Sequence, residues 1–228
     1  MPLTDTTRAE LVELSTHYPD PRSALLPMLH LVQSEDGQVS LDGIELCADV
    51  LGITTAEVAA VATFYTMYKR HRTGKHHIGV CTNTMCAVLG GDAVWQALSD
   101  DLGVGHDETT PDGEFMLERI ECQAACTYAP SVTVDWEFLD NATPEGVRDV
   151  IAKLRAGEPV QSTRGPVIRD WRATERTLAL PDDGLVGEGG GADANMQAGL
   201  IVAKERGMSA PGIPLTGSSN GSSKEGTA

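Results

Sequence analysis

Apolar residues recur at helical spacing through residues 1–72. The clearest case is the segment 22–34, where they lie three and four positions apart, and Gly37 follows where such a helix is expected to end. We expect Thr7 to cap an earlier helix that runs through an apolar stretch of its own. Residues 1–72 are therefore predicted to form a small helical bundle.

Two further helices of this bundle are predicted from the residues at their starts. Ser40 precedes one apolar-periodic segment, and Thr54 with Glu57 has the spacing of a capping box ahead of the next. That last helix is expected to run through VAAVATFYTMY and contains Phe64 and Tyr65. We expect both rings to pack in the core of an amphipathic helix in preference to forming an interface.

The hydrophobic period changes over residues 73–156. One helix is expected after the sequence CTNTMC, and Thr143 with Pro144 has the residue types that begin another. Three short segments have the composition or the alternation of strands: 76–80, 115–121 and 131–136. This order of strands and helices favours a small α/β sandwich of the thioredoxin type, so the whole chain is assigned to the α+β class.

Residues 157–228 differ in composition from the rest of the chain. They hold 13 of the 24 glycines, in stretches such as GEGGGADAN and TGSSNGSSKEGTA. Such segments bury too little apolar surface to offset the entropy of ordering. We expect an extended or disordered tail, in which residues 171–181 are the part most suited to dock on another surface.

Four of the five cysteines form two closely spaced pairs, Cys81-x4-Cys86 and Cys122-x3-Cys126. Each pair follows a predicted strand, so two loops at one edge of a sheet would offer four sulfurs to one site. A [2Fe–2S] cluster requires four thiolates, two for each iron. Cys86 falls in the first turn of a predicted helix, where free N–H groups and the helix dipole favour an anionic sulfur.

Other uses of these cysteines are less favoured by their spacing. Structural zinc takes four thiolates more often from tighter C-x2-C knuckles, and dithiol exchange is typical of a C-x-x-C motif that this chain lacks. Both alternatives remain open at this point. Cys47 has apolar neighbours at helical spacing and is expected to be a buried thiol.

Composition and charge limit the classes of partner. A net charge of −16 disfavours nucleic acid and anionic membranes, because phosphates repel such a surface. We see neither a signal peptide nor an apolar stretch long enough to cross a bilayer, and expect an intracellular protein without direct membrane insertion. Residues 46–65 imitate a helix-turn-helix, but a redox-sensing DNA-binding protein is a remote alternative because the candidate recognition helix has no Lys or Arg.

Several segments together resemble a known family. They are VATFYTMY at 61–68, CTNTMC at 81–86, HDETTPDG at 106–113, FMLERIECQAACTYAP at 115–130 and TPE at 143–145. In these segments the chain resembles the thioredoxin-like [2Fe–2S] subunit of bacterial NADH-quinone oxidoreductase, respiratory complex I, known as the 24 kDa or E subunit. The resemblance covers roughly residues 10–156 and implies that Cys81, Cys86, Cys122 and Cys126 are the cluster ligands.

The resemblance also implies a function as one part of a larger, proton-translocating enzyme. The chain would exchange single electrons with the FMN of the NADH-binding flavoprotein subunit, and it would contact the adjacent iron–sulfur subunit. FMN and NADH would reside on the partner, since this chain has no complete active site of its own. The complex would place it peripherally on the cytoplasmic side of the bacterial inner membrane. Alternatives are the equivalent subunit of an NAD-linked hydrogenase or formate dehydrogenase, or a free-standing thioredoxin-like ferredoxin.

Some positions near the cysteines carry expectations of their own. Many relatives have Leu-Gly within the second cysteine pair, where this chain has Gln123 and Ala124, which could alter packing and potential. Pro130 stands just before a predicted strand, where thioredoxin-like folds often hold a cis proline. We expect His76 and His77 to be structural residues, because four cysteines already suffice for a cluster.

Overall fold

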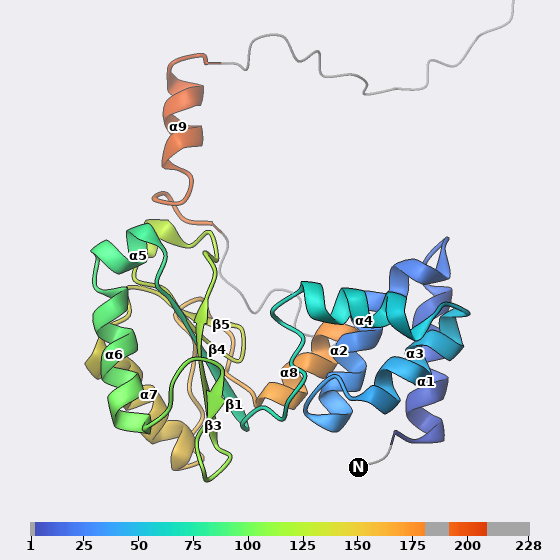
Figure 1. Ribbon diagram of the computed structural model, residues 1–228. Helices are drawn as coiled ribbons and strands as arrows, with labels where there is room; N and C mark the ends of the chain where they lie inside the picture. Colours follow the sequence, from blue (N-terminus) through green and yellow to red (C-terminus); the bar gives the residue numbers. More distant parts are fainter. Residues whose placement is uncertain (1–2, 181–191, 209–228) are drawn as a thin grey trace, which may run out of the picture. The chain divides into compact units, whose positions relative to one another are not determined.

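A computed structural model describes residues 3–180 and 192–208. The chain divides into two compact units, of which the first ends at Gly190 and the second begins at Gly191. The first unit contains a group of helices and a mixed sheet (Figure 1), each with its own buried apolar cluster. The predicted α+β class, with helices ahead of a sheet domain, is confirmed.

The helical part follows the sequence prediction closely. Its elements are α1 Asp5–Thr16, a 3-10 turn Pro21–Ala24, α2 Leu25–Asp36, α3 Leu41–Leu51 and α4 Thr55–Phe64. Ser40 caps α3, the Thr54–Glu57 capping box begins α4, and Gly37 ends α2 with a φ of 70°. The expected cap of α1 was wrong by one turn, because Thr4 is the N-cap and Thr7 is its partner in a capping box.

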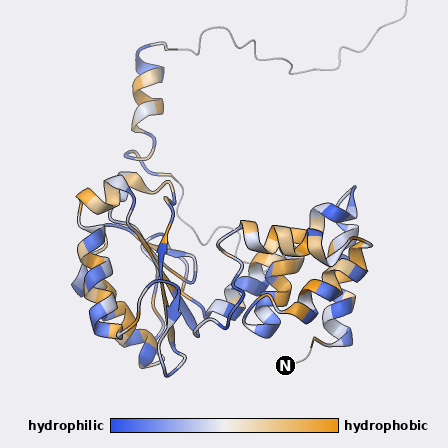
Figure 2. Ribbon diagram, viewed as in Figure 1, coloured by the Kyte–Doolittle hydropathy of each residue, from blue (hydrophilic) through white to orange (hydrophobic). Residues whose placement is uncertain are grey.

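Figure 2 shows hydrophobic residues concentrated on helices α2, α3 and α4 of the helical part. Its core is built around fully buried side chains such as Leu11, Met28 and Leu29. Phe64 lies outside this core and is 77% exposed, so the expectation that it packs inward was wrong. Its ring instead stacks edge-on against Tyr65 at the end of α4, with ring centroids 4.8 Å apart.

The second part is a five-stranded sheet with the order β2-β3-β1-β4-β5. The strands are β1 His76–Cys81, β2 Glu108–Thr109, β3 Phe115–Ile120, β4 Val132–Val134 and β5 Glu137–Leu139. β1 and β3 run parallel, whereas β4 runs antiparallel to β1. β2 and β5 were not anticipated from the sequence, since two- and three-residue strands carry almost no periodic signal.

The part of the chain that forms this sheet also contains three helices: α5 Thr84–Val88, α6 Gly91–Leu102 and α7 Pro144–Arg155. Apolar residues of α6 and α7, such as Leu98 and Ile151, share one buried cluster with Ile78 and Val80 of β1. Thr143 and Pro144 begin α7 as predicted. The single helix expected after CTNTMC is divided into α5 and α6 at Gly90, which has a φ of 110° that ends one helix and redirects the next.

The expected tail at 157–228 requires correction over its first part. Residues 157–180 are folded, and α8 Trp171–Ala179 packs against α2. Trp171 is fully buried, and its backbone N–H donates to the Lys75 carbonyl over 2.9 Å. The prediction that residues 171–181 contain the docking segment is confirmed for the described residues, up to Leu180.

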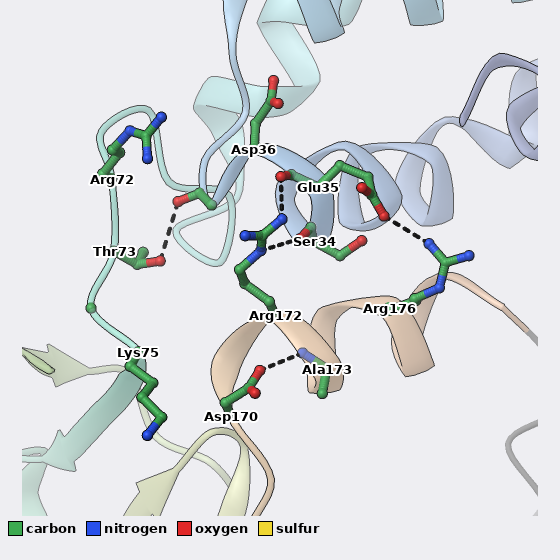
Figure 3. Close-up of a pocket in the computed structure, with 12 residues that line it drawn as sticks. Ser34, Glu35, Asp36, Arg72, Thr73, Lys75, Asp170, Arg172, Ala173 and Arg176 are labelled. Carbon is green, nitrogen blue, oxygen red and sulfur yellow. Dashed lines mark hydrogen bonds and ion pairs between the residues drawn. The ribbon is translucent and has the colours of Figure 1, made fainter. Parts of the chain in front are cut away.

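Two arginines attach α8 to the carboxyl end of α2 (Figure 3). The Arg172 guanidinium donates to the Ser34 carbonyl over 2.5 Å and also to the Glu35 carbonyl. Arg176 forms an ion pair with the Glu35 carboxylate at 2.9 Å. The last carbonyls of a helix have no partner within the helix, so Arg172 both satisfies them and complements the helix dipole.

A buried carboxylate joins α8 to both parts of the first unit. Glu175 is fully buried, and its Oε2 lies 2.6 Å from His30 Nδ1 and 2.8 Å from Gln33 Nε2, both on α2. Its Oε1 accepts from Trp136 Nε1, beside the β4–β5 turn, over 3.0 Å. Glu175 therefore links the helical part to the sheet through three partners.

Residues 192–208 belong to the second compact unit, which contains α9 Ala198–Glu205. No helix in the two described ranges is both long and apolar enough for a membrane crossing. The stretch TGSSNGSSKEGTA and the first half of GEGGGADAN, both expected to be extended or disordered, lie outside the described residues.

Candidate metal centre

The first cysteine pair lies where β1 ends and α5 begins. Cys81 is the last residue of β1, and Cys86 lies in the first turn of α5, after the N-cap Asn83. Both cysteines are buried. The Asn83 side-chain amide lies 3.8 Å from the Cys81 sulfur and donates to the Ile120 carbonyl over 3.2 Å. Asn83 thus ties this loop to the end of β3.

The second pair follows β3. Cys122 lies just beyond the strand, and Cys126 begins a 3-10 turn that ends at Tyr128. Their sulfurs are 3.6 Å apart, and both residues are exposed. Because β1 and β3 are parallel and Cys81 pairs with Ile120, the loops after both strands leave the sheet at the same edge.

The two pairs influence each other electrostatically. Burial raises the pKa of the Cys86 thiol to about 11, and the neighbouring sulfurs of Cys81 and Cys126 also raise it, whereas a hydrogen bond from the Ser131 N–H lowers it. The pKa of Cys126 is raised chiefly by its contact with Cys122, with a contribution from Cys81. A cationic group beside these sulfurs would favour their thiolate forms.

The donor set fits a [2Fe–2S] cluster. Each iron of such a cluster takes two thiolates, and the structure offers two pairs at one sheet edge. Within residues 3–180 and 192–208, no group of three or more His, Cys, Asp or Glu side chains lies close enough together to hold a metal ion without rearrangement. At this edge the buried hydroxyl of Ser131 has no hydrogen-bond partner among the residues that the structure describes. These residues would hold a cationic iron–sulfur core, which supplies the charge that the thiolates need.

The two histidines before Cys81 have partners elsewhere. His76 Nδ1 lies 2.6 Å from Asp135 Oδ2, and His77 Nε2 lies 2.6 Å from Glu118 Oε2. Both are buried, which agrees with a structural role. The remaining cysteine, Cys47, is buried in α3, and burial raises its pKa to about 12. The expected cis peptide bond is confirmed between Ala129 and Pro130.

Gly91 supports the site in a way that the sequence did not reveal. A Cβ at this position would lie 2.6 Å from the Cys81 carbonyl oxygen and 2.8 Å from that of Cys86, and backbone atoms cannot move aside locally. The first turn of α6 therefore packs directly on the loop that carries the first cysteine pair. Only the close approach of two segments creates this requirement, so nothing in the local sequence indicates it.

We expect Gly91→Ala to displace this loop and lower the iron content of the purified chain. Overpacking of this kind typically costs about 1–3 kcal/mol of folding free energy. Gly146→Ala is the matched control, because Gly146 also lies in the first turn of a helix but its added Cβ would meet only a side-chain oxygen, at 3.3 Å. Iron analysis and thermal unfolding measure both effects. Equal iron content in the two variants would contradict the packing argument.

Ala124 lies in the second cysteine loop with a φ of 55°, in the left-handed region. A residue with a Cβ is disfavoured there by roughly 1–2 kcal/mol. We expect Ala124→Gly to raise the free energy of unfolding by up to about 1 kcal/mol, since the larger unfolded-state entropy of glycine offsets part of the relief.

The neighbouring Ala125 is the control for this change, because its φ is −94°. Ala125→Gly relieves no strain, removes a buried methyl group and adds the entropic cost of glycine, so it should lower stability. Thermal unfolding of the cluster-loaded variants compares the two. If both glycine variants lose the same stability, Ala124 is not strained in the folded protein.

The chain belongs to the thioredoxin-like [2Fe–2S] ferredoxin family, whose sequence profile matches residues 11–155. It is 54% identical over 203 residues to the E subunit of NADH-quinone oxidoreductase from Mycobacterium tuberculosis, covering 89% of this chain and 81% of that relative. It is 36% identical over 146 residues to NADH-quinone oxidoreductase subunit 2 of Thermus thermophilus, covering 64% of this chain and 81% of the relative. These homologues are subunits of an oxidoreductase complex.

A solved structure also shares the fold. The NAD+-reducing [NiFe]-hydrogenase in its air-oxidised state superposes with a TM-score of 0.52 at 17% identity. The match covers 58% of this chain and 23% of the hydrogenase chain. At this identity the similarity establishes the fold alone.

Proposed function

We propose that Cys81, Cys86, Cys122 and Cys126 hold one [2Fe–2S] cluster, and that the chain exchanges single electrons with FMN on a flavoprotein subunit of NADH-quinone oxidoreductase. The observation that carries this proposal is the position of the two cysteine pairs, which follow the parallel strands β1 and β3 at one edge of the sheet. When bound, the cluster supplies a site that takes up and releases one electron at a time.

The two cysteine pairs would differ in their roles: one would hold the cluster in the interior, and the other would hold it at the surface, where a partner can reach it. Cys81 and Cys86 lie in the interior, where Ile120 and Ala129 exclude water. Cys122 and Cys126 are exposed, so an electron partner could approach from their side. NADH delivers a hydride, and a flavin must separate its two electrons before one-electron transfer. The flavoprotein therefore binds both FMN and NADH, and neither is expected to bind to this chain.

The sequence relatives favour NADH-quinone oxidoreductase over a hydrogenase or formate dehydrogenase as the host. We place the chain in contact with the NADH- and FMN-binding subunit and with the adjacent iron–sulfur subunit. The complex would lie on the cytoplasmic side of the bacterial inner membrane, with this chain as a peripheral component. A surface of net charge −16 is unsuited to binding anionic lipid directly.

The decisive experiment is anaerobic co-purification of this chain with the flavoprotein of the same organism. We expect equal amounts of iron and acid-labile sulfide on this chain, and an electron paramagnetic resonance signal of a reduced [2Fe–2S] cluster. NADH should reduce the cluster only in the presence of the flavoprotein. Zinc in place of iron would refute the cluster, whereas a cluster that reduced flavoprotein neither binds nor reduces would refute the partner.

A further inference from the structure

Ser131 is bonded through its backbone to both residues of the first cysteine pair. It follows the cis Pro130 and leads into β4. Its carbonyl accepts the Cys81 N–H over 3.1 Å, and its own N–H donates to the Cys86 sulfur. The residue is only 1% exposed. Its position is thus set by two of the proposed ligands and by the strand that follows.

The Ser131 hydroxyl has no hydrogen-bond partner within the described part of the protein. Its Oγ is among the few buried side-chain polar atoms that lack one there. A buried hydroxyl without a partner costs free energy, and nearly all such groups in proteins are satisfied. An acceptor that the described residues do not supply is therefore expected next to this oxygen.

The sheet geometry indicates on which side that acceptor lies. Ser131 stands opposite Cys81 across the antiparallel β1–β4 pair, and opposite residues project to the same face of a sheet. The neighbouring Val132 projects to the other face and belongs to the apolar cluster formed with α6 and α7. The Ser131 hydroxyl accordingly lies on the face that carries the Cys81 sulfur.

We propose that the Ser131 hydroxyl donates a hydrogen bond to a sulfur of the iron–sulfur centre and thereby raises its reduction potential. This inference rests on the proposed function, because the acceptor is either a ligand thiolate or an inorganic sulfide of the cluster. Such sulfurs accept hydrogen bonds, and donors to them are a recognised means of tuning potentials.

The direction of the effect follows from charge. Reduction adds one electron to the iron pair, breaks no bond and leaves the hydroxyl proton on Ser131. The extra negative charge on the sulfurs strengthens a hydrogen bond that already points to them. The donor consequently stabilises the reduced form more than the oxidised form. Removing the hydroxyl should lower the potential while keeping the four ligands.

Thr133 offers a matched control on the same strand. Its Oγ1 is also buried and lacks a partner among the described residues, and it projects to the same face as Ser131. It stands opposite Gly79, however, two residues farther from the end of β1 that carries Cys81. Thr133→Val removes a hydroxyl with little change of volume in the same sheet, but at a distance from the sulfurs.

The test uses the full chain loaded with its cluster and compares the natural protein with Ser131→Ala and Thr133→Val. Dithionite titration followed by electron paramagnetic resonance gives the midpoint potential. For Ser131→Ala we expect a fall that corresponds to a change on the order of tenfold in the equilibrium constant of reduction. For Thr133→Val we expect no change. Equal potentials in all three proteins would overturn the inference.

A second readout detects the proposed hydrogen bond directly. Electron–nuclear double resonance of the natural protein in H2O and D2O should show exchangeable protons coupled to the reduced cluster, and Ser131→Ala should lose one of these couplings while the coupling of the backbone N–H at residue 131 remains. An identical set of exchangeable couplings in the natural protein and in Ser131→Ala would overturn the inference. If the natural protein gave no [2Fe–2S] signal at all, the proposed function itself would fail, and the two failures are thereby distinguished.

Discussion

Cys122→Ser should abolish or strongly shift the electron paramagnetic resonance signal of the reduced cluster, because it removes one of the four thiolates. Cys122 and Cys126 form the exposed pair, with sulfurs 3.6 Å apart. A serine hydroxyl is a poorer iron ligand than a thiolate and is largely protonated at neutral pH. We expect iron and sulfide in the purified variant to fall from about two of each per chain toward zero.

Cys47→Ala provides the control for this substitution. Cys47 is fully buried in the helical part, and burial raises its pKa to about 12, so it remains a neutral thiol. Its replacement removes a cysteine without touching the site and should leave the spectrum unchanged. An unaltered spectrum in Cys122→Ser would refute the ligand assignment, and equal losses in both variants would indicate general destabilisation.

Glu175→Ala should destabilise the folded chain by about 3–5 kcal/mol, the range seen when one partner of a buried polar or charged set is removed. Glu175 is fully buried and is the common partner of His30, Gln33 and Trp136. Its loss leaves these three polar groups without their partner in the interior and opens a cavity beneath α8. Urea unfolding of the full chain measures the change.

Leu178→Ala in the same helix separates this effect from a general weakening of α8. Leu178 is 48% exposed, so its truncation should cost well under the loss expected for Glu175. Limited proteolysis should cut near α8 in the Glu175 variant before it cuts elsewhere, since this residue joins the helix to both parts of the unit. A loss below about 1 kcal/mol for Glu175→Ala would show that water replaces the carboxylate without penalty.

The elements that sequence analysis located correctly share a local cause. Ser40 and the Thr54–Glu57 box cap helices through hydrogen bonds that span three residues, and Gly37 ends α2 through its own backbone conformation. Even the error at the first helix was one of register, since Thr7 takes part in the capping box that Thr4 begins. Capping signals of this kind depend on residues close together in the chain, so they can be recognised from the sequence alone.

The larger errors concern residues whose partners are distant in the chain. α8 carries few apolar residues, and it is ordered because Trp171 and Glu175 find partners in segments that lie far away in the sequence. Phe64 has the residue type of a core position, yet it remains largely exposed. Neither the folding of α8 nor the exposure of Phe64 could be predicted from hydrophobic periodicity. Periodicity reports whether a residue is apolar, but not which residues pack against it.

By itself the sequence determined the two cysteine pairs, the strand ahead of each pair and the helix start that holds Cys86. The tertiary structure places both cysteine loops at one edge of the sheet, because β1 pairs in parallel with β3. It also decided that Gly91 must lack a side chain and that the Ser131 hydroxyl has no partner among the described residues. The spacing of the cysteines along the chain indicates which cofactor they suit. Their positions in space depend on packing between segments that are remote in the sequence.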